Sequence, residues 1–341
     1  MGSRGALANR LISKVAITCG THGNERAGVV LCQELQRQPL RRSSCDIRCV
    51  LSNPAAAKAD RRYVDTDLNR CFGLADLDPA RPAQPTLEAR RARELDAELG
   101  PKRSAEPATD FILDLHNTTA NTGTLLCFHP DDEFAHELAA QLHRLDPSVR
   151  AARWPTGDQP FLPTVARSGM TVEIGPVPHS TVNAELTRHT LQLLHSACDY
   201  IERRNVDLAA RQAAGGSFEG SAERQSETVA LPVARRLATI DYPRGSDGEY
   251  GGATPSPSAF VHPSLQGVAE LQDGSTISAG DPLFLKLDGS TLQFEPAEYG
   301  ITAEQEAAGL YPFFVNEAAY YEKSIAMVLA ARDTVQVQVL A

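Results

Sequence analysis

The sequence predicts an α/β fold followed by a smaller β-rich C-terminal domain. Apolar runs typical of buried strands alternate with amphipathic helical patterns over residues 1–204. Residues 205–228 are dominated by Ala, Gly, Ser, Gln and Glu, a composition typical of a linker or a disordered insertion. From residue 229 to residue 341 the pattern changes to short β segments separated by Gly, Pro and Asp. We therefore expect a main domain, a linker and a β-rich domain, in that order.

The individual elements follow from hydrophobic periodicity and from turn residues. The predicted strands of the main domain are 15–19, 47–51, 111–115, 124–128 and 170–174, and its clearest helices are 87–99, 133–145 and 184–203. The later β segments are 237–242, 282–287, 291–294, 311–315 and 335–340. The strand at 111–115 is almost continuously apolar, which predicts a sheet covered on both faces.

Composition restricts the class of partner and compartment. The chain has 341 residues, 42% hydrophobic and 22% charged, and a formal net charge of −10. This charge argues against nucleic acid or an anionic membrane surface as a partner. No apolar run is long enough to span a membrane, and residues 1–10 lack the apolar core of a secretion signal. Seven cysteines without a Cys-x-x-Cys motif argue against a disulfide framework, so we expect a cytoplasmic protein.

The segment Gly20–Glu25 lies between the first predicted strand and the first helix. This places His22 and Glu25 on a strand-to-helix loop, where sites of α/β folds gather. An imidazole and a carboxylate three residues apart can both reach one cation. A catalytic zinc takes three protein ligands and keeps a fourth position for water, so a third ligand must come from elsewhere. The alternative is a loop His and a loop Glu that are merely solvated.

His116 ends the apolar strand at 111–115 and is a candidate for that third ligand. Asp114 interrupts the same strand, and residues two apart on a strand point to the same side. Asp114 is therefore a candidate partner that fixes the tautomer of His116. The alternative is a core histidine with satisfied hydrogen bonds.

Two further segments carry unusual charges. The loop Arg61–Arg70 is either an exposed loop with surface ion pairs or an anion-binding loop, in which Arg70 and Asn69 are suitable donors. Glu173 lies within an apolar strand, where an unpaired carboxylate is costly, so it is either ion-paired or functional.

Taken together, these segments resemble the aspartoacylase (aminoacylase-2) family, in the succinylglutamate desuccinylase/aspartoacylase branch of the zinc-carboxypeptidase-like hydrolases. The matching segments occur in family order over nearly the whole chain: Gly20–Glu25, Arg62–Arg70, Asp114–Thr119, Glu173–Pro176 and Asn316–Lys323. The resemblance implies a zinc-carboxypeptidase-like mixed sheet flanked by helices as the catalytic domain. It also implies that the β-rich domain contributes to the pocket, and it suggests a homodimer.

The resemblance further implies roles for particular residues. It makes His22, Glu25 and His116 the ligands of one zinc ion per chain, with Glu173 as the general base and acid. Arg62 would polarise the scissile carbonyl. The substrate-binding residues would be Asn69, Arg70, Arg167 and Tyr320, with Arg167 gripping the second carboxylate of an acyl-aspartate.

The expected reaction is the deacylation of N-acyl-L-aspartate, a small anionic substrate. Alternatives are a deacylase of N-acyl aromatic amino acids, a succinylglutamate desuccinylase, and an inactive zinc-binding scaffold, although no ligand or base is missing. Two departures from the family affect the substrate preference. Pro163 stands where the family has an aromatic substrate contact, and the segment between Arg167 and Glu173 is shorter than in the animal enzymes.

Overall fold

The computed structural model describes residues 10–81, 85–213, 226–243 and 258–341. The strands are β1 Lys14–Cys19, β2 Asp46–Leu51, β3 Phe111–Asn117, β4 Gly123–Phe128, β5 Val149–Arg153, β6 Ser168–Gly175, β7 Ser226–Asp241, β8 Phe260–Val261, β9 Pro282–Leu285, β10 Thr291–Gln293, β11 Tyr311–Phe313 and β12 Ile325–Leu340. The α-helices are α1 Arg26–Arg37, α2 Pro54–Ala59, α3 Leu87–Leu99, α4 Glu133–Leu145, α5 Ala184–Ala213, α6 Ala303–Ala307 and α7 Ala318–Tyr321, and the 3₁₀ helices are η2 Leu68–Arg70, η3 Leu162–Val165 and η4 Pro296–Tyr299.

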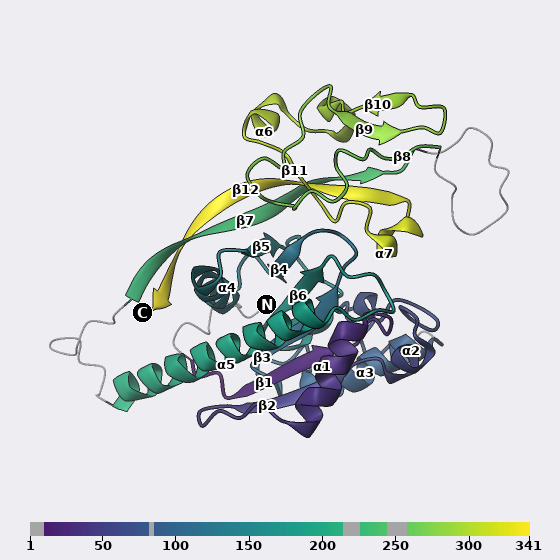
Figure 1. The fold of residues 1–341 in the computed structure, drawn as a ribbon. Helices are drawn as coiled ribbons and strands as arrows, with labels where there is room; N and C mark the ends of the chain where they lie inside the picture. The colour runs from purple at the N-terminus through teal and green to yellow at the C-terminus, as the bar shows by residue number, and fades with distance from the viewer. Residues whose placement is uncertain (1–9, 82–84, 214–225, 244–257) are drawn as a thin grey trace.

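A mixed nine-stranded sheet organises the described part of the chain (Figure 1). Its strand order is β11-β12-β7-β5-β4-β6-β3-β1-β2. Strands β2, β1, β3 and β6 are parallel neighbours, and β4 runs antiparallel to β6. The carboxyl ends of β1, β3 and β6 therefore meet at one edge of the sheet, which is where ligand sites of open α/β sheets form.

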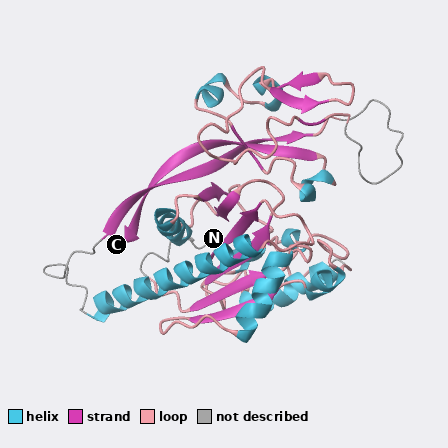
Figure 2. Ribbon diagram, viewed as in Figure 1, coloured by secondary structure: helices cyan, strands magenta, loops and turns pink. Residues whose placement is uncertain are grey.

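Apolar side chains cover both faces of the parallel strands, as the continuous apolar runs predict. On one face, Ile17 and Leu113 pack with helices α1, α4 and α5 in the largest core cluster. On the other face, Ala16 and Ile112 pack with α3, η2 and η3. Figure 2 shows the longer helices gathered around this part of the molecule. No helix in the described ranges is both long and apolar enough to cross a bilayer.

The C-terminal part shares the main sheet instead of forming a fully separate body. The segments expected at 237–242 and 335–340 are the ends of two 16-residue strands, β7 and β12, which pair along their length. β7 joins β5 in the main sheet, while the small antiparallel sheet β10-β9-β8 packs beyond it (Figure 1). The predicted α/β class with a smaller β-rich C-terminal part is confirmed.

Residues 205–213 of the expected linker are helical, which corrects that part of the prediction. Helix α5 was expected to end at Arg203 but continues to Ala213. The buried Asn205 explains the extension, because its side-chain amide exchanges two hydrogen bonds with the backbone of Ile12, at 2.9 and 2.7 Å. The composition of residues 205–228 does not reveal this contact, since Ile12 lies 193 residues before Asn205. Ser226–Thr228 belong to β7, and residues 214–225 lie outside the described residues.

Candidate active site

Three side chains with metal-ligating groups converge at the carboxyl ends of β1 and β3. His22 and Glu25 lie on the loop between β1 and α1, and His116 lies near the end of β3. Glu25 places one oxygen 2.6 Å from His22 Nδ1 and the other 2.9 Å from His116 Nδ1. All three residues are buried. The parallel pairing of β1 with β3 brings together residues that are 94 positions apart.

The hydrogen bonds of the two imidazoles indicate that this cluster suits a cation. The Nε2 atom of His116 lies 2.8 Å from Asp114 Oδ2, and that of His22 lies 3.0 Å from Asp67 Oδ1. An Nε2–H directed at each carboxylate leaves the Nδ1 lone pairs free. These two Nδ1 atoms are only 3.1 Å apart and both face Glu25. Converging lone pairs beside a carboxylate favour a bound metal ion, and two histidines with one carboxylate are a common zinc donor set.

Asp114 fixes His116 through a buried network. Besides His116, its carboxylate accepts hydrogen bonds from the hydroxyls of Thr18 and Thr21, at 2.7 and 2.8 Å. The contact with His116 is the one that the two-residue strand spacing predicts. Such a carboxylate orients the ring and raises the basicity of the nitrogen that faces the metal.

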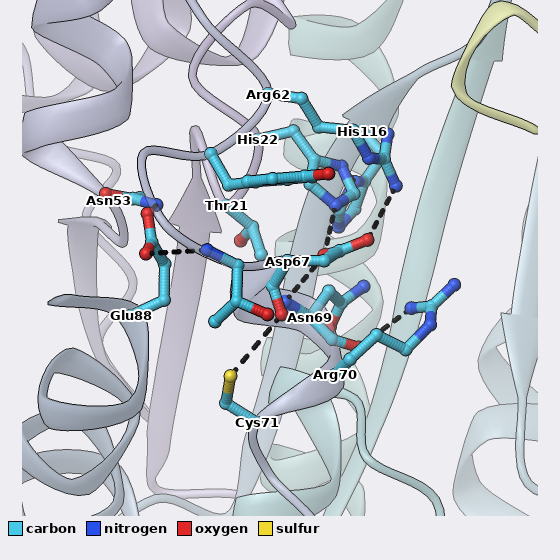
Figure 3. A network of polar contacts seen from close by, with 12 residues as sticks. Thr21, His22, Asn53, Arg62, Asp67, Asn69, Arg70, Cys71, Glu88 and His116 are labelled. Carbon is cyan, nitrogen blue, oxygen red and sulfur yellow. Dashed lines mark hydrogen bonds and ion pairs between the residues drawn. The ribbon is translucent and has the colours of Figure 1, made fainter. Parts of the chain in front are cut away.

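Asp67 serves His22 in the same way, and sequence reasoning missed this residue. Its other oxygen, Oδ2, accepts from Arg62 Nη2 at 3.2 Å (Figure 3). Arg62 Nη1 in turn lies 3.4 Å from Glu25 Oε1. Arg62 therefore lies between Glu25, a candidate metal ligand, and Asp67. The signal was present, because Asp67 belongs to the charged loop that contains Arg62 and Arg70.

A buried carboxylate holds this loop in place. Glu88, in the first turn of α3, accepts hydrogen bonds from the backbone N–H groups of Val64, Asp65 and Thr66, at 2.7 to 3.2 Å. Asn53 donates to the same carboxylate, as Figure 3 shows. These bonds lower the pKa of Glu88 against the opposing effect of burial. The position of the Arg62–Asp67 segment is therefore determined by α3.

Glu173 on β6 lies beside the metal-ligating cluster. Parallel pairing of β3 with β6 sets Glu173 opposite His116, and Glu173 lines the same pocket as His22 and Glu25. Burial raises the pKa of Glu173 to about 7. A carboxyl group whose pKa lies near neutrality can both accept and return a proton.

The pocket is closed by residues from distant parts of the chain. Its lining comprises His22, Glu25, Arg62, Asn69, Arg70, Asn117, Thr118, Cys127, Trp154, Phe161, Thr171, Glu173, Phe314, Glu317, Ala319 and Tyr320. The C-terminal part is anchored by Glu317, which accepts hydrogen bonds from the Thr118 and Thr119 hydroxyls and from the Thr119 and Ala120 N–H groups. The pocket therefore forms only when both parts of the chain are in place.

Four aromatic side chains form a wall of this pocket: Trp154, Phe161, Phe314 and Tyr320. The guanidinium of Arg70 lies 5.2 Å from the centre of the Phe161 ring, which is within range of a cation–π contact. Asn69 Oδ1 accepts from the backbone N–H of Leu162, which leaves its amide N–H groups to face a ligand. Tyr320 packs edge-on against Phe314, and burial raises its pKa to about 12, so it stays protonated.

Arg167 does not lie in the pocket, which corrects its expected role. It directly precedes the first residue of β6, whereas Glu173 lies near the other end of that strand. Its guanidinium pairs with Glu106 at 2.6 Å and donates to the carbonyl of Ala105 at 3.0 Å. Six residues of extended chain span roughly 20 Å, so both side chains cannot reach one small substrate. Arg167 is a structural ion-pair residue.

The aromatic contacts illustrate what sequence reasoning could not locate. Pro163 replaces the aromatic residue expected from the resemblance, yet Phe161, two positions earlier, supplies a ring to the pocket. Trp154, the only tryptophan of the sequence, directly follows β5, a short strand that was not predicted because Ala151 and Ala152 give it little β character. Glu317 lies within the family-matching segment Asn316–Lys323, but the resemblance implies no role for it.

Comparison with known proteins agrees with this geometry. Residues 12–201 match the model of the Succinylglutamate desuccinylase/Aspartoacylase catalytic domain, and residues 235–332 match that of the AstE/AspA barrel-sandwich hybrid domain. A probable aspartoacylase of Acaryochloris marina is 35% identical, over 96% of this chain and 98% of its own. An N-acyl-aromatic-L-amino acid amidohydrolase (carboxylate-forming) of Mus musculus is also 35% identical, over 96% of this chain and 93% of its own.

Among solved structures, murine aminoacylase 3 superposes with a TM-score of 0.80 at 31% identity, covering 97% of this chain and 99% of that one. The sequence motifs, the described sheet and these full-length similarities agree. The chain is therefore a hydrolase of the N-acyl amino acid amidohydrolase type and belongs to the succinylglutamate desuccinylase/aspartoacylase family.

Proposed function

We propose that this protein is a zinc-dependent deacylase of N-acyl amino acids whose side chains are aromatic or otherwise apolar. The observation that carries the proposal is the composition of the pocket. Among its described lining residues, the arginines are Arg62 and Arg70, and four further lining residues are aromatic. Arg62 is engaged by Glu25 and Asp67, which leaves Arg70 for the α-carboxylate that every N-acyl amino acid carries. A second substrate carboxylate has no further arginine to bind in this lining.

The pocket residues include the groups that amide hydrolysis requires. A zinc ion held by His22, Glu25 and His116 would supply a Lewis acid that activates water and polarises the scissile carbonyl. Glu173 takes the proton of the attacking water and returns it to the leaving nitrogen, which an amide needs because an amine anion leaves very poorly. The Arg62 guanidinium stabilises the developing oxyanion.

The binding of the substrate carboxylate rests on Arg70 and Asn69. The side-chain amide of Asn117 adds a further polar group, since it is buried in the pocket lining and has no hydrogen-bond partner among the described residues. Unpartnered buried amides are costly, so this group is suited to a ligand. The apolar substrate side chain then packs against Trp154 and Phe161.

The earlier expectation of an acyl-aspartate substrate depended on Arg167, which pairs with Glu106 outside the pocket. The names of the relatives include both probable aspartoacylases and N-acyl-aromatic-L-amino acid amidohydrolases, so similarity alone favours neither substrate. The aromatic wall favours the second.

The test is the specificity constant of the zinc-loaded enzyme on acetyl-tyrosine, acetyl-alanine, acetyl-aspartate and succinyl-glutamate. We expect acetyl-tyrosine to exceed acetyl-aspartate by about tenfold or more, because burying an aromatic ring contributes on the order of 2 kcal/mol. Trp154→Ala should narrow the preference for acetyl-tyrosine over acetyl-alanine. An enzyme that prefers acetyl-aspartate would refute the proposal.

The role of Glu173 is tested separately. Glu173→Gln keeps the shape of the side chain but removes proton transfer. It should retain zinc while turnover falls by about a hundredfold or more. Thr171→Ser, a mild change at a pocket residue of the same strand, is the control and should stay near normal. Near-normal turnover of Glu173→Gln would reassign the base.

A further inference from the structure

Three cysteine thiols form a second cluster, away from the histidine site. Cys19 ends β1, Cys49 lies on the neighbouring strand β2, and Cys32 lies on α1, which packs over these strands. The strand register explains the first pair, because Cys19 pairs with Leu51, two residues beyond Cys49, and alternate residues of a strand share a face. All three cysteines are free thiols, Cys19 and Cys32 are buried, and Cys49 is half-buried.

The spacing of the sulfur atoms matches a metal–thiolate site. The three Sγ atoms lie within 4.8 Å of one another, and those of Cys19 and Cys49 are 3.8 Å apart. With metal–sulfur bonds of about 2.3 Å, sulfurs around a single ion are separated by roughly 3.8 to 4.0 Å. A disulfide requires about 2.05 Å, so the present geometry is nearer to shared coordination than to a bond.

The protonation of the cluster also suits a cation. The neighbouring thiols of Cys19 and Cys49 lower the pKa of Cys32 to about 4. The side-chain amide of Gln36 donates to the same sulfur, at 3.5 Å. The cluster therefore readily supplies a thiolate, which is the form of cysteine that binds metals.

The three sulfur donors determine which cation the site prefers. Thiolates favour soft ions such as copper(I) and zinc. Zinc in structural sites is almost always four-coordinate, but no fourth His, Cys, Asp or Glu ligand joins the group within the described ranges. A cavity of about 150 Å³ reaches Cys49 and is lined mainly by Ile17, Leu35, Pro39, Leu40 and Ile47. Such an apolar cavity offers a path for an ion but is a poor place for a zinc-bound water.

We propose that Cys19, Cys32 and Cys49 bind one copper(I) ion in three-coordinate geometry. Binding displaces thiol protons to solvent, and neither copper nor sulfur changes its oxidation state. This site is independent of the proposed deacylase activity. Along the chain it is close to the loop of the histidine site, however, since Cys19 is separated from His22 by only two residues.

The experiment is an anaerobic competition for copper(I) between the reduced, zinc-loaded full-length protein and a chromophoric copper(I) chelator. We expect the protein to retain about one copper(I) per chain. Cys32→Ser and Cys49→Ser should each weaken copper(I) binding by about a hundredfold or more. Each variant loses a ligand itself, whereas losing only a hydrogen-bond partner of a metal ligand typically costs about ten- to hundredfold. Cys198→Ser removes a buried thiol outside the cluster and should bind normally. His116→Ala should also retain copper(I), which separates this site from the histidine site.

Melting curves show which variants remain folded, and Cys32→Ala provides a second substitution should the serine variant unfold. Three results would overturn the proposal. The first is copper(I) uptake that is equal in wild type and both cluster variants. The second is uptake that is lost in His116→Ala. The third is a second equivalent of zinc, in place of copper(I), held by the three thiols.

Discussion

Asp67 Oδ1 lies 3.0 Å from His22 Nε2, the ring nitrogen opposite the one that faces Glu25. The same carboxylate pairs with Arg62, so one residue orients the imidazole of a candidate metal ligand and the Arg62 guanidinium together. Asp114 does the equivalent for His116 from the other side of the site. His22 is thus held by a carboxylate from the loop before η2, and His116 by a carboxylate of its own strand, β3.

Asp67→Asn should weaken zinc binding by about 10- to 100-fold. His22 and Arg62 contact different oxygens of Asp67, and the amide of asparagine replaces one of these acceptors with an N–H donor. A competition assay with a chromophoric zinc chelator measures the change. Asp60→Asn, an exposed position nearby with a left-handed backbone that asparagine tolerates, is the control. Unchanged zinc affinity in Asp67→Asn would show that Asp67 does not orient the ligand.

Arg167→Ala should leave the ratio of specificity constants for acetyl-tyrosine and acetyl-aspartate unchanged. Its guanidinium pairs with Glu106 and not with any pocket residue, so its loss should cost about 1 kcal/mol of stability. Steady-state kinetics on both substrates and urea unfolding measure the two effects. A selective loss of acetyl-aspartate activity would restore Arg167 to substrate binding.

Glu317→Gln should destabilise the protein at neutral pH, with a difference from wild type that shrinks in acid. Burial raises the pKa of Glu317, but the His179 imidazole at 3.5 Å and a hydrogen bond from Thr118 hold it at about 2, below the ordinary value of 4.5. A depressed folded-state pKa contributes stability that is present above pH 4.5 and is lost as pH falls toward 2. The contribution is on the order of 3 kcal/mol, estimated from this shift.

Urea unfolding of wild type and Glu317→Gln between about pH 7 and pH 3.5 measures this dependence. Glu298→Gln, at an exposed position, should show little difference from wild type at any pH. A wild-type advantage that is constant across the range would mean that the carboxylate charge of Glu317 does not contribute.

Asn205→Ala should lower stability by about 1–3 kcal/mol, because it leaves the buried backbone N–H and C=O of Ile12 without partners. Urea unfolding measures the loss. Val206→Ala, at the exposed neighbouring position of α5, is the matched control and should stay within about 0.5 kcal/mol of wild type. An unaffected Asn205→Ala protein would restore the interpretation of this segment as a dispensable linker.

Local sequence was sufficient for most strands and helices of the main domain, but not for β5, for the end of α5 or for the full length of β7 and β12. His22, Glu25 and His116 follow predicted parallel strands, and the carboxyl ends of such strands meet at one edge whatever their separation along the chain. The Asp114–His116 contact follows from the two-residue period of a strand. Zinc as the bound ion, the roles of the site residues, the domain boundaries, the cytoplasmic location and the homodimer stay predictions.

Tertiary structure alone determined which residues surround the carboxyl ends of β1, β3 and β6. Trp154, Phe161 and Glu317 reach the pocket from segments far apart in the sequence, through strand order and pairing. Arg167 resembles a substrate residue by its neighbours but lies at the wrong end of β6. Periodicity encodes which way a side chain points along its own element. Which side chains then face one another depends on long-range register, and no local pattern in the sequence carries that information.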